Sequence, residues 1–276
     1  MIKAIVSGAA GRMGRGIISI IADTKGIEIC GGIEKNGDRS IGKDIGEVAG
    51  IGRCGIPVCD DMEEIVDECD VIIDFTAPGV SMEHIEIAAR KNKAIVIGTT
   101  GFSGGERKGI DGMSNNLRCV IAPNMSVGIN VMFKLLRDVA SILGEGYDIE
   151  IVEAHHRLKK DAPSGTAIRM AEILAHTLKR DLEKVGVYSR KGIIGERSKD
   201  EIGIQTIRAG DIVGEHTVIF GGIGERLEIT HRAQSRDNFA GGAVRAAIWI
   251  VDQRPGIYDM QDVLGLELSP KGEGHA

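Results

Sequence analysis

Short apolar runs and helical segments alternate along the first 125 residues. The apolar runs, bounded by glycine or polar residues, predict buried strands at 3–7, 27–34, 71–75, 94–98 and 119–122. Two of them, 71–75 and 94–98, are almost continuously apolar, which is typical of parallel strands covered on both faces. Segments 12–23 and 81–91 show the three- and four-residue spacing of helices. We therefore expect a Rossmann-like, doubly wound α/β domain with a parallel sheet.

The pattern changes after about residue 126. A long helix is predicted at 127–143, where Val131, Leu135, Val139 and Ile142 recur at helical spacing. Further elements are a strand at 148–154, a helix at 166–178 capped by Ser164, and strands at 203–208, 216–220 and 226–231. Glycines at 221–224 predict a hairpin between the last two strands. Successive strands without helices between them indicate a second, α+β domain with an open mixed sheet.

The chain returns to helix at 239–251, and we expect this helix to pack back on the first domain. The first domain then comprises residues 1–126 and 236–276 and is discontinuous, while residues 127–235 form the second. Both lengths suffice for a hydrophobic core.

Composition narrows the class of protein. The 276 residues are 42% hydrophobic and 27% charged, as in ordinary globular proteins, and the net charge of −6 disfavours a broad nucleic-acid surface. We expect no membrane partner and a cytoplasmic location, because no apolar run has transmembrane length and the N-terminus lacks a signal-peptide layout. The five cysteines lack zinc-site spacing and are interpreted as buried thiols, with a Cys54/Cys59 redox pair as the less favoured alternative.

The turn after the first strand is rich in glycine. Strand 3–7 leads directly into Gly8-Ala9-Ala10-Gly11-Arg12-Met13-Gly14 and then into a helix. Glycines let the backbone approach a pyrophosphate, and the helix N-terminus offers N–H groups to it. Glu34 ends the second strand about 20 residues on, where an acid accepts from adenosine ribose hydroxyls. This arrangement predicts a dinucleotide site, although a glycine-rich turn alone can be merely structural.

The choice between NADH and NADPH stays open on these residues. Glu34 favours NADH because its charge opposes a 2′-phosphate, whereas Lys35 and Arg12 could neutralise that phosphate. We therefore predict use of both cofactors. Gly98-Thr99-Thr100-Gly101 and Ala122-Pro123-Asn124-Met125 follow predicted parallel strands and should flank the nicotinamide, unless they are ordinary turns.

The densest group of reactive side chains lies at 153–166, with the sequence Glu-Ala-His-His-Arg-Leu-Lys-Lys-Asp-Ala-Pro-Ser-Gly-Thr. Adjacent His155 and His156 at a strand end suit proton transfer near neutrality. Ser164-Gly165-Thr166 opens a helix whose N–H groups can bind a carboxylate. A small anionic substrate beside a proton donor is the favoured interpretation, and a solvated basic loop is the alternative.

A metal site is the competing functional hypothesis for the same loop. Consecutive residues on an extended chain point to opposite sides, so His155 and His156 cannot easily bind one ion. No nearby carboxylate or cysteine is expected to complete a ligand set. We predict no metal.

Several motifs together resemble the dihydrodipicolinate reductase family, whose enzyme is also called 4-hydroxy-tetrahydrodipicolinate reductase. They are Gly8–Gly14, Asp74-Phe75-Thr76, Gly98–Phe102, Glu153–Arg157 with Asp161–Thr166, Arg208–His216 and Gly224–His231. The resemblance extends over nearly the whole chain, and the block from His155 to Thr166 is its most specific part.

The resemblance implies a reaction and roles for individual residues. The reaction is hydride transfer from NADH or NADPH to 4-hydroxy-tetrahydrodipicolinate, with loss of water, in lysine and diaminopimelate biosynthesis. Implied cofactor contacts are Gly8, Ala9, Ala10, Gly11, Arg12, Met13, Glu34, Lys35, Gly98, Thr99, Thr100, Ala122, Pro123, Asn124 and Met125. His155 and Lys159 match catalytic positions, and His156, Gly165 and Thr166 match substrate-binding ones. The first domain would bind the dinucleotide, and the second would bind substrate and form a homotetramer.

One departure from the family and two rival functions remain. Pro123-Asn124-Met125 stands where some members carry Ala-Asn-Phe, which affects the packing around the nicotinamide. One rival is another two-domain NAD(P)-dependent amino-acid or semialdehyde dehydrogenase, and it would have no reason to carry Ser164-Gly165-Thr166 behind the two histidines. The other is a nicotinamide-sensing binding protein without turnover, which the clustered proton donors disfavour.

Overall fold

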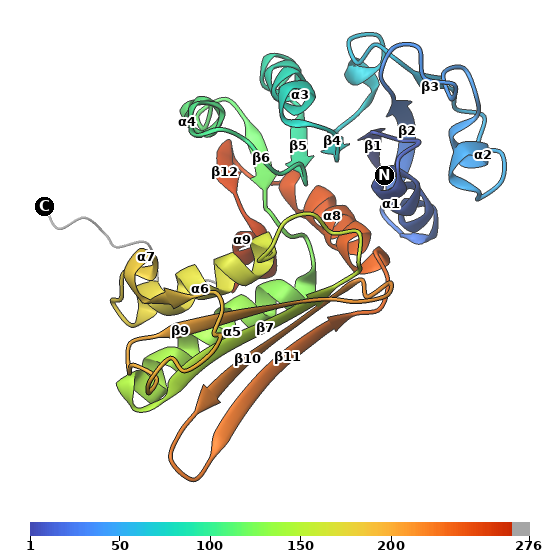
Figure 1. Ribbon diagram of the computed structural model, residues 1–276. Helices are drawn as coiled ribbons and strands as arrows, with labels where there is room; N and C mark the ends of the chain where they lie inside the picture. The colour runs from blue at the N-terminus through green and yellow to red at the C-terminus, as the bar shows by residue number, and fades with distance from the viewer. Residues whose placement is uncertain (267–276) are drawn as a thin grey trace, which may run out of the picture. The chain divides into compact units, whose positions relative to one another are not determined.

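The computed structural model describes residues 1–266, which divide into two compact units (Figure 1). The first unit contains Met1–Val127 and the segment that begins at Arg236, and the second contains Gly128–Ser235. No helix among the described residues is long and apolar enough to cross a membrane.

The first unit is built on a seven-stranded sheet in which every pairing is parallel. In spatial order the strands are β12 (Gly256–Tyr258), β6 (Arg118–Ile121), β5 (Ala94–Ile97), β4 (Val71–Asp74), β1 (Ile2–Ser7), β2 (Ile27–Ile33) and β3 (Val58–Cys59). The chain order reverses between β1 and β4, and ligands bind beside such a switch point, outside the carboxyl ends of the strands.

Helices cover both faces of this sheet (Figure 1). On one face lie α1 (Arg12–Asp23), α2 (Ile45–Ala49), α8 (Asp237–Ile250) and α9 (Met260–Leu264). On the other lie α3 (Pro78–Arg90), the 3-10 turn Val66–Glu68 and α4 (Gly104–Gly112). Ala4 and Val6 of β1 therefore pack against the α1 side and Ile5 against the α3 side, so successive strand residues are all apolar.

The second unit contains a mixed five-stranded sheet. Its order is β11 (Arg226–Ala233), β10 (Gly214–Gly221), β7 (Asp148–His155), β9 (Ile202–Arg208) and β8 (Gly186–Val187). The first two pairings are antiparallel and the last two are parallel. Helices α5 (Val127–Leu143) and α6 (Gly165–Thr177) form a core with one face of the sheet, and the short α7 (Leu182–Val185) follows. Both sheets confirm the predicted fold class.

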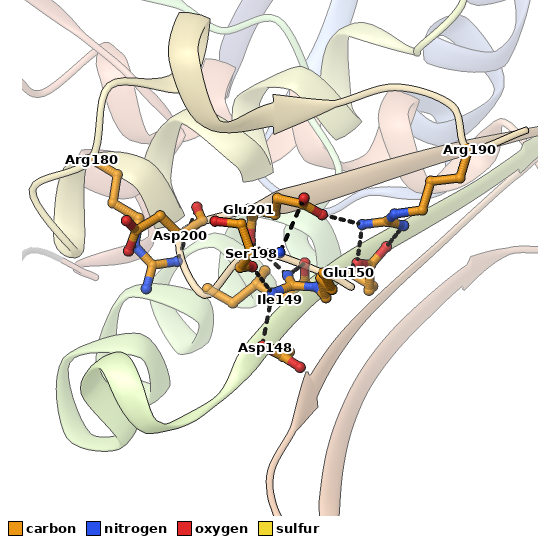
Figure 2. Close-up of polar contacts among 9 residues, drawn as sticks. Asp148, Ile149, Glu150, Arg180, Arg190, Ser198, Asp200 and Glu201 are labelled. Atoms are coloured by element: carbon orange, nitrogen blue, oxygen red, sulfur yellow. Dashed lines mark hydrogen bonds and ion pairs between the residues drawn. The ribbon is translucent and has the colours of Figure 1, made fainter. Parts of the chain in front are cut away.

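An arginine–carboxylate network fastens the segment 188–201 to β7 (Figure 2). Arg190 binds both Glu150 oxygens at 2.9 and 2.7 Å and also contacts Glu201 at 3.0 Å. Arg197 donates to Asp148 and to the Ile149 carbonyl. Gly203 is required on the neighbouring strand, because a Cβ there would lie 1.8 Å from a Glu150 oxygen. These contacts lie on the sheet face that no helix of this unit covers.

The helix predicted at 127–143 is confirmed as α5, but most of the apolar residues whose spacing predicted it are not the ones buried against the sheet. Val131, Leu135 and Ile142 are 38, 43 and 80% exposed, whereas the residues buried against the sheet are Ile129, Met132, Phe133, Leu136 and Ala140. Both sets recur at helical spacing, because this helix is apolar around most of its circumference. The elements that sequence patterning missed are short: α2, β3, α4, α7, β8, β12, α9 and two 3-10 turns.

Candidate functional site

The glycine turn after β1 is fixed by its own backbone. The N–H groups of Gly8 and Ala9 both donate to the Ile33 carbonyl at the end of β2. Gly8 has a φ of 76°, and a Cβ on Gly14 would lie 2.1 Å from the Gly8 oxygen. Only glycine satisfies these two positions, because the helix starts directly against the turn.

The first turn of α1 offers unpaired N–H groups. Arg12, Met13 and Gly14 donate to no described residue, and Gly11 supplies no side-chain cap. The first helical turn contains no acidic residue. Three aligned N–H groups and the positive end of the helix dipole favour an anion such as pyrophosphate. Ala10, by contrast, donates its N–H to Glu34 Oε1 at 2.8 Å.

A cavity of about 980 Å³ opens beside this turn, a volume that suits a large ligand. Of the predicted cofactor contacts, Gly8, Ala10, Gly11, Glu34 and Lys35 line it. It also has a basic rim that sequence reasoning missed, made of Arg15, Arg39 and Lys43, which form no ion pair with any described residue. Arg15 comes from α1, whereas Arg39 and Lys43 belong to the segment after β2, and the acids Asp38, Glu47, Asp60 and Glu83 line the same cavity.

A second cavity, of about 240 Å³, brings together Gly98 and Ala122–Met125 of the predicted nicotinamide contacts, but not Thr99 or Thr100. It is lined by Met13, Phe75, Gly98, Ala122, Pro123, Asn124, Met125 and Phe239. The Phe75 ring lies so close to Gly98 that a Cβ there would be 2.1 Å from a ring carbon. Phe75 lines both cavities, and its part in the site was not predicted.

Four predicted contacts line neither cavity. Ala9 is fully buried in the core, while Arg12 and Thr100 are exposed. Thr99 is buried and donates its hydroxyl to Asp74 at 3.1 Å. Side-chain contact with the cofactor is therefore not supported for Ala9 and Thr99, although the Arg12 N–H stays available.

Asp74 organises the ends of three strands. Its carboxylate is fully buried and contacts Thr76, Ser81 and Thr99 through Oδ1 and His84 Nδ1 through Oδ2, the last at 2.5 Å. His84 Nδ1 also lies 3.3 Å from the Ser7 hydroxyl on β1. The network holds the turns after β1, β4 and β5 in register. Two sequence signals pointed to this place: an acid at the end of an apolar strand, and the motif Asp74-Phe75-Thr76 of the family resemblance.

Glu153 occupies the corresponding place in the second unit. It is fully buried near the end of β7, and its oxygens accept from His155 Nδ1 at 2.6 Å and the Ser164 N–H at 3.0 Å. Arg208 binds both oxygens at 2.9 Å, and Thr206 donates at 3.2 Å. Burial raises the pKa of Glu153, but hydrogen bonds from His155, Arg208 and Ser164 outweigh it and lower the pKa to about 2.

His216 of β10 closes the other side of His155. The two rings meet edge to face with centroids 5.2 Å apart, and His216 Nε2 lies 3.1 Å from the Ser164 hydroxyl. That hydroxyl accepts from the Ala167 N–H, which confirms Ser164 as the N-cap of α6. Burial, reinforced by neighbouring His155, lowers the pKa of His216 to about 3, so the ring is neutral near pH 7. Arg208 and His216 begin and end a motif that carries the family resemblance, but sequence reasoning assigned neither of them a role in the site.

The remaining predicted residues lie on the loop that follows β7. Lys159 Nζ contacts Asp161 at 2.9 Å, and the Lys159 N–H donates to the His156 carbonyl. His156 has a buried Nδ1 without a partner among the described residues. Gly165 and Thr166 are the first two residues of α6. They directly follow Ser164, whose N–H donates to Glu153 near the end of β7. The structure therefore brings His155, Lys159 and the start of α6 into one region of the second unit.

A carboxylate, that of Glu153, lies beside His155, where no carboxylate was expected to complete a metal-ligand set. Arg208 neutralises Glu153, however, and no group of three His, Cys, Asp or Glu side chains within residues 1–266 could hold a metal ion.

Comparison with known proteins shows which family this chain matches. The N-terminal model of dihydrodipicolinate reductase matches residues 2–125, and the C-terminal model matches residues 128–264. A 4-hydroxy-tetrahydrodipicolinate reductase of Syntrophus aciditrophicus is 60% identical, covering 96% of this chain and 99% of that protein. One from Citrifermentans bemidjiense is 58% identical and covers 96% and 100%.

Solved structures share the fold. A dipicolinate-bound dihydrodipicolinate reductase from Paenisporosarcina superposes with a TM-score of 0.75 at 24% identity, covering 95% of this chain and 98% of that one. Aspartate semialdehyde dehydrogenase II from Vibrio cholerae reaches 0.54 at 11% identity over 91% and 98%. Fold alone therefore does not separate the reductase from the rival dehydrogenase, whereas the sequence relatives do.

Proposed function

The chain belongs to the dihydrodipicolinate reductase family, and from this premise we propose how its residues perform the reaction. The activity is NAD(P)H-dependent reduction of 4-hydroxy-tetrahydrodipicolinate in lysine and diaminopimelate biosynthesis. The observation that supports it best is the first turn of α1: its three N–H groups have no partner among the described residues, and the turn that leads into it, with Gly8, Ala10 and Gly11, lines a cavity large enough for a dinucleotide.

The first unit is the cofactor-binding domain in this proposal. The N–H groups of Arg12, Met13 and Gly14 hold the pyrophosphate, and Glu34 accepts from the adenosine ribose through the oxygen that Ala10 leaves free. The smaller cavity around Gly98 and Met125 receives the nicotinamide. Bound NADH or NADPH supplies the hydride.

The choice of cofactor is part of the proposal. Glu34 opposes a 2′-phosphate, while Lys35, Arg39 and Lys43 supply positive charge around the same cavity. Because both sets of groups line one space, we infer that NADH and NADPH are both used. Arg12, named for this role from its sequence position, lines neither cavity and is assigned only its backbone N–H.

The second unit binds the substrate. Its dicarboxylate is held by the N-terminus of α6 at Gly165 and Thr166 and by His156. His155 or Lys159 gives the proton as negative charge develops on the ring nitrogen side. His155 donates its Nδ1 hydrogen to Glu153, which leaves Nε2 for the substrate. The ion pair with Asp161 holds the Lys159 side chain close to the loop.

The second unit is also proposed to assemble the homotetramer. Its sheet has helices on one face only, and residues on the other face include Ile207, which is 47% exposed. Light scattering that gives a monomer mass at micromolar concentration would contradict this. A cytoplasmic location stays a prediction.

One spectrophotometric experiment tests the reaction. NADH and NADPH oxidation is followed at 340 nm, with substrate generated in the cuvette by the preceding synthase from pyruvate and aspartate semialdehyde. Rapid oxidation that depends on both synthase substrates supports the proposal and ranks the cofactors. No oxidation by folded protein, or oxidation with aspartate semialdehyde alone, would return the assignment to the rival dehydrogenase or binding protein.

A further inference from the structure

We propose that Glu153 is a positioning residue of the reduction: its buried carboxylate holds His155 in one tautomer and fixes it relative to the N-terminus of α6. The inference rests on the proposed function, because it takes His155 as a proton donor to the substrate.

Every hydrogen-bonding position of the Glu153 carboxylate is engaged. Oε2 accepts from His155 and Arg208, and Oε1 accepts from Ser164, Thr206 and Arg208. Arg208 thus forms a two-pronged pair with both oxygens, the geometry in which a guanidinium stabilises a carboxylate best. With the side chain fully buried and its pKa lowered to about 2, Glu153 is charged at any working pH.

An ionised carboxylate can only accept hydrogen bonds. His155 Nδ1, 2.6 Å away, must therefore bear the hydrogen, so that Nε2 is the nitrogen that exchanges a proton elsewhere. The ring is also confined by its neighbours. His216 meets its edge, and a Cβ on Gly214 would lie 3.1 Å from Nε2, so a larger residue there would push the ring by a few tenths of an ångström.

The same carboxylate reaches the helix that receives the substrate. Ser164 donates its N–H to Glu153 Oε1 while its hydroxyl caps α6 through Ala167. The proton donor and the start of α6 are therefore tied to the two oxygens of one side chain. A shift of about 1 Å in such an arrangement can cost about 10²-fold in rate.

A purely structural role is the competing explanation, and the chain provides a matched control for it. Glu150 lies three residues earlier on β7, faces the opposite side of the sheet, and is bound by Arg190 in the same two-pronged manner (Figure 2). Neither Glu150 nor Arg190 contacts His155. Glu150 is 24% exposed and Glu153 is fully buried, so Glu150→Gln controls for loss of a two-pronged pair on β7; if such pairs only support the fold, neither substitution should change kcat or its pH profile.

The experiment compares these two variants with the unsubstituted enzyme. In Glu153→Gln the new amide can donate to His155 Nδ1, which favours the opposite tautomer. We expect kcat to fall by about 10²-fold or more, as in other enzymes where a histidine loses its orienting carboxylate. NADH affinity should stay within about twofold. Glu150→Gln should keep kcat within about threefold even if it lowers Tm.

The pH profile provides a readout that a structural role would not change. The charged and titratable groups that contact His155, or its partner Glu153, are Glu153, Arg208 and His216. Removing the one negative charge among them should move the alkaline limb of kcat to lower pH in Glu153→Gln and leave it in place in Glu150→Gln. Nitrogen-15 spectra of the histidine rings report the tautomer directly.

The outcomes separate the inference from the proposed function. If His155→Ala lowers kcat but Glu153→Gln keeps both kcat and the pH profile, the positioning role is wrong and the proton donor stands. If His155→Ala is fully active, the proposed function of His155 fails first. If Glu153→Gln does not fold, the nitrogen-15 spectrum of the unsubstituted protein tests the proposal instead. A hydrogen on Nε2 of His155 rather than on Nδ1 would overturn the proposal.

Discussion

Helix α8 lies so close to the backbone of Met125, which lines the smaller cavity, that no side chain fits between them at Gly242. A Cβ placed on Gly242 would lie 1.8 Å from the Met125 carbonyl oxygen and 2.8 Å from its carbon. Met125 is buried and lines the cavity assigned to the nicotinamide. Gly242→Ala therefore sets a single methyl group against the backbone of the cofactor turn.

The size of the effect follows from that distance. A carbon–oxygen contact needs about 3.3 Å, so the turn or the helix must move by about 1.5 Å to receive the methyl group. Overpacking of this kind costs about 1–3 kcal/mol, against a gain of up to about 1 kcal/mol from replacing glycine in a helix. We expect a net loss of about 1–2 kcal/mol, which lowers Tm by a few degrees, and about tenfold weaker NADH binding.

The neighbouring residue supplies the control. A Cβ on Gly241 would meet only Ile20 Cδ1 at 4.0 Å, an ordinary contact, so Gly241→Ala should raise Tm slightly and leave NADH binding unchanged. Calorimetric unfolding and fluorescence titration with NADH measure both effects. Equal stabilisation by the two substitutions would refute the close approach of α8. A lower Tm with unaltered NADH affinity would instead remove Met125 from the cofactor site.

Three further predictions concern catalysis, cofactor choice and pH. His155→Ala and Lys159→Ala should each lower kcat by about 10²–10⁴-fold in the coupled assay, and losses below about fivefold in both would contradict their roles. The ratio of kcat/KM for NADH and NADPH should stay below about 10³, and Arg39→Ala with Lys43→Ala should weaken binding of NADPH but not NADH in titrations. The pKa of His216 is lowered from 6.5 to about 3, so unfolding takes up a proton between these values. The stability that neutral His216 contributes is therefore complete above pH 6.5, and the free energy of unfolding should fall by about 1.4 kcal/mol per pH unit below it. Protonation of Glu153 lowers the free energy of unfolding further below pH 4.5. In His216→Asn, the midpoint of urea unfolding should depend less on pH between 6.5 and 4.5.

The strands of the first sheet were predictable because both of their faces are covered. Val71–Asp74 and Ala94–Ile97 are completely buried, so each reads as an unbroken apolar run. Strand β12 has only three residues, too few for periodicity, and it joins the sheet by pairing Gly256 with Arg118, far away in the chain. Such a pairing exists only in the folded sheet.

The buried side of α5 could not be predicted for a different reason. Two apolar stripes run along this helix, and the choice between them depends on which one meets Ile149 and Val218 of the sheet. Periodicity identifies a helix but does not identify its partner when apolar residues surround most of the axis. The 80% exposure of Ile142 is the result of that choice.

Sequence reasoning found the parts of the site that depend on local backbone. Gly8 and Gly14 were recognisable because a turn and a close approach require glycine there. Alternation along β7 also puts Glu153 on the same side as the core residue Ile151 and two positions before His155, a signal that could have been used. Arg208 could not be found in this way, because it reaches Glu153 through the pairing of β9 with β7.

Both units place a buried carboxylate at a strand end and bind a histidine Nδ1 to it, Asp74 to His84 and Glu153 to His155. Their surroundings differ: the partners of Asp74 are hydroxyl groups, a backbone N–H and the imidazole, while Glu153 also has the guanidinium of Arg208. Removing either acceptor alone is costly, because each buried donor left behind loses its hydrogen-bond partner. We therefore expect the acids in these two motifs to affect a bound ligand only indirectly, by fixing the backbone and the imidazole beside it. An acid-to-amide change should consequently alter geometry and proton transfer even though neither carboxylate is assigned a contact with cofactor or substrate.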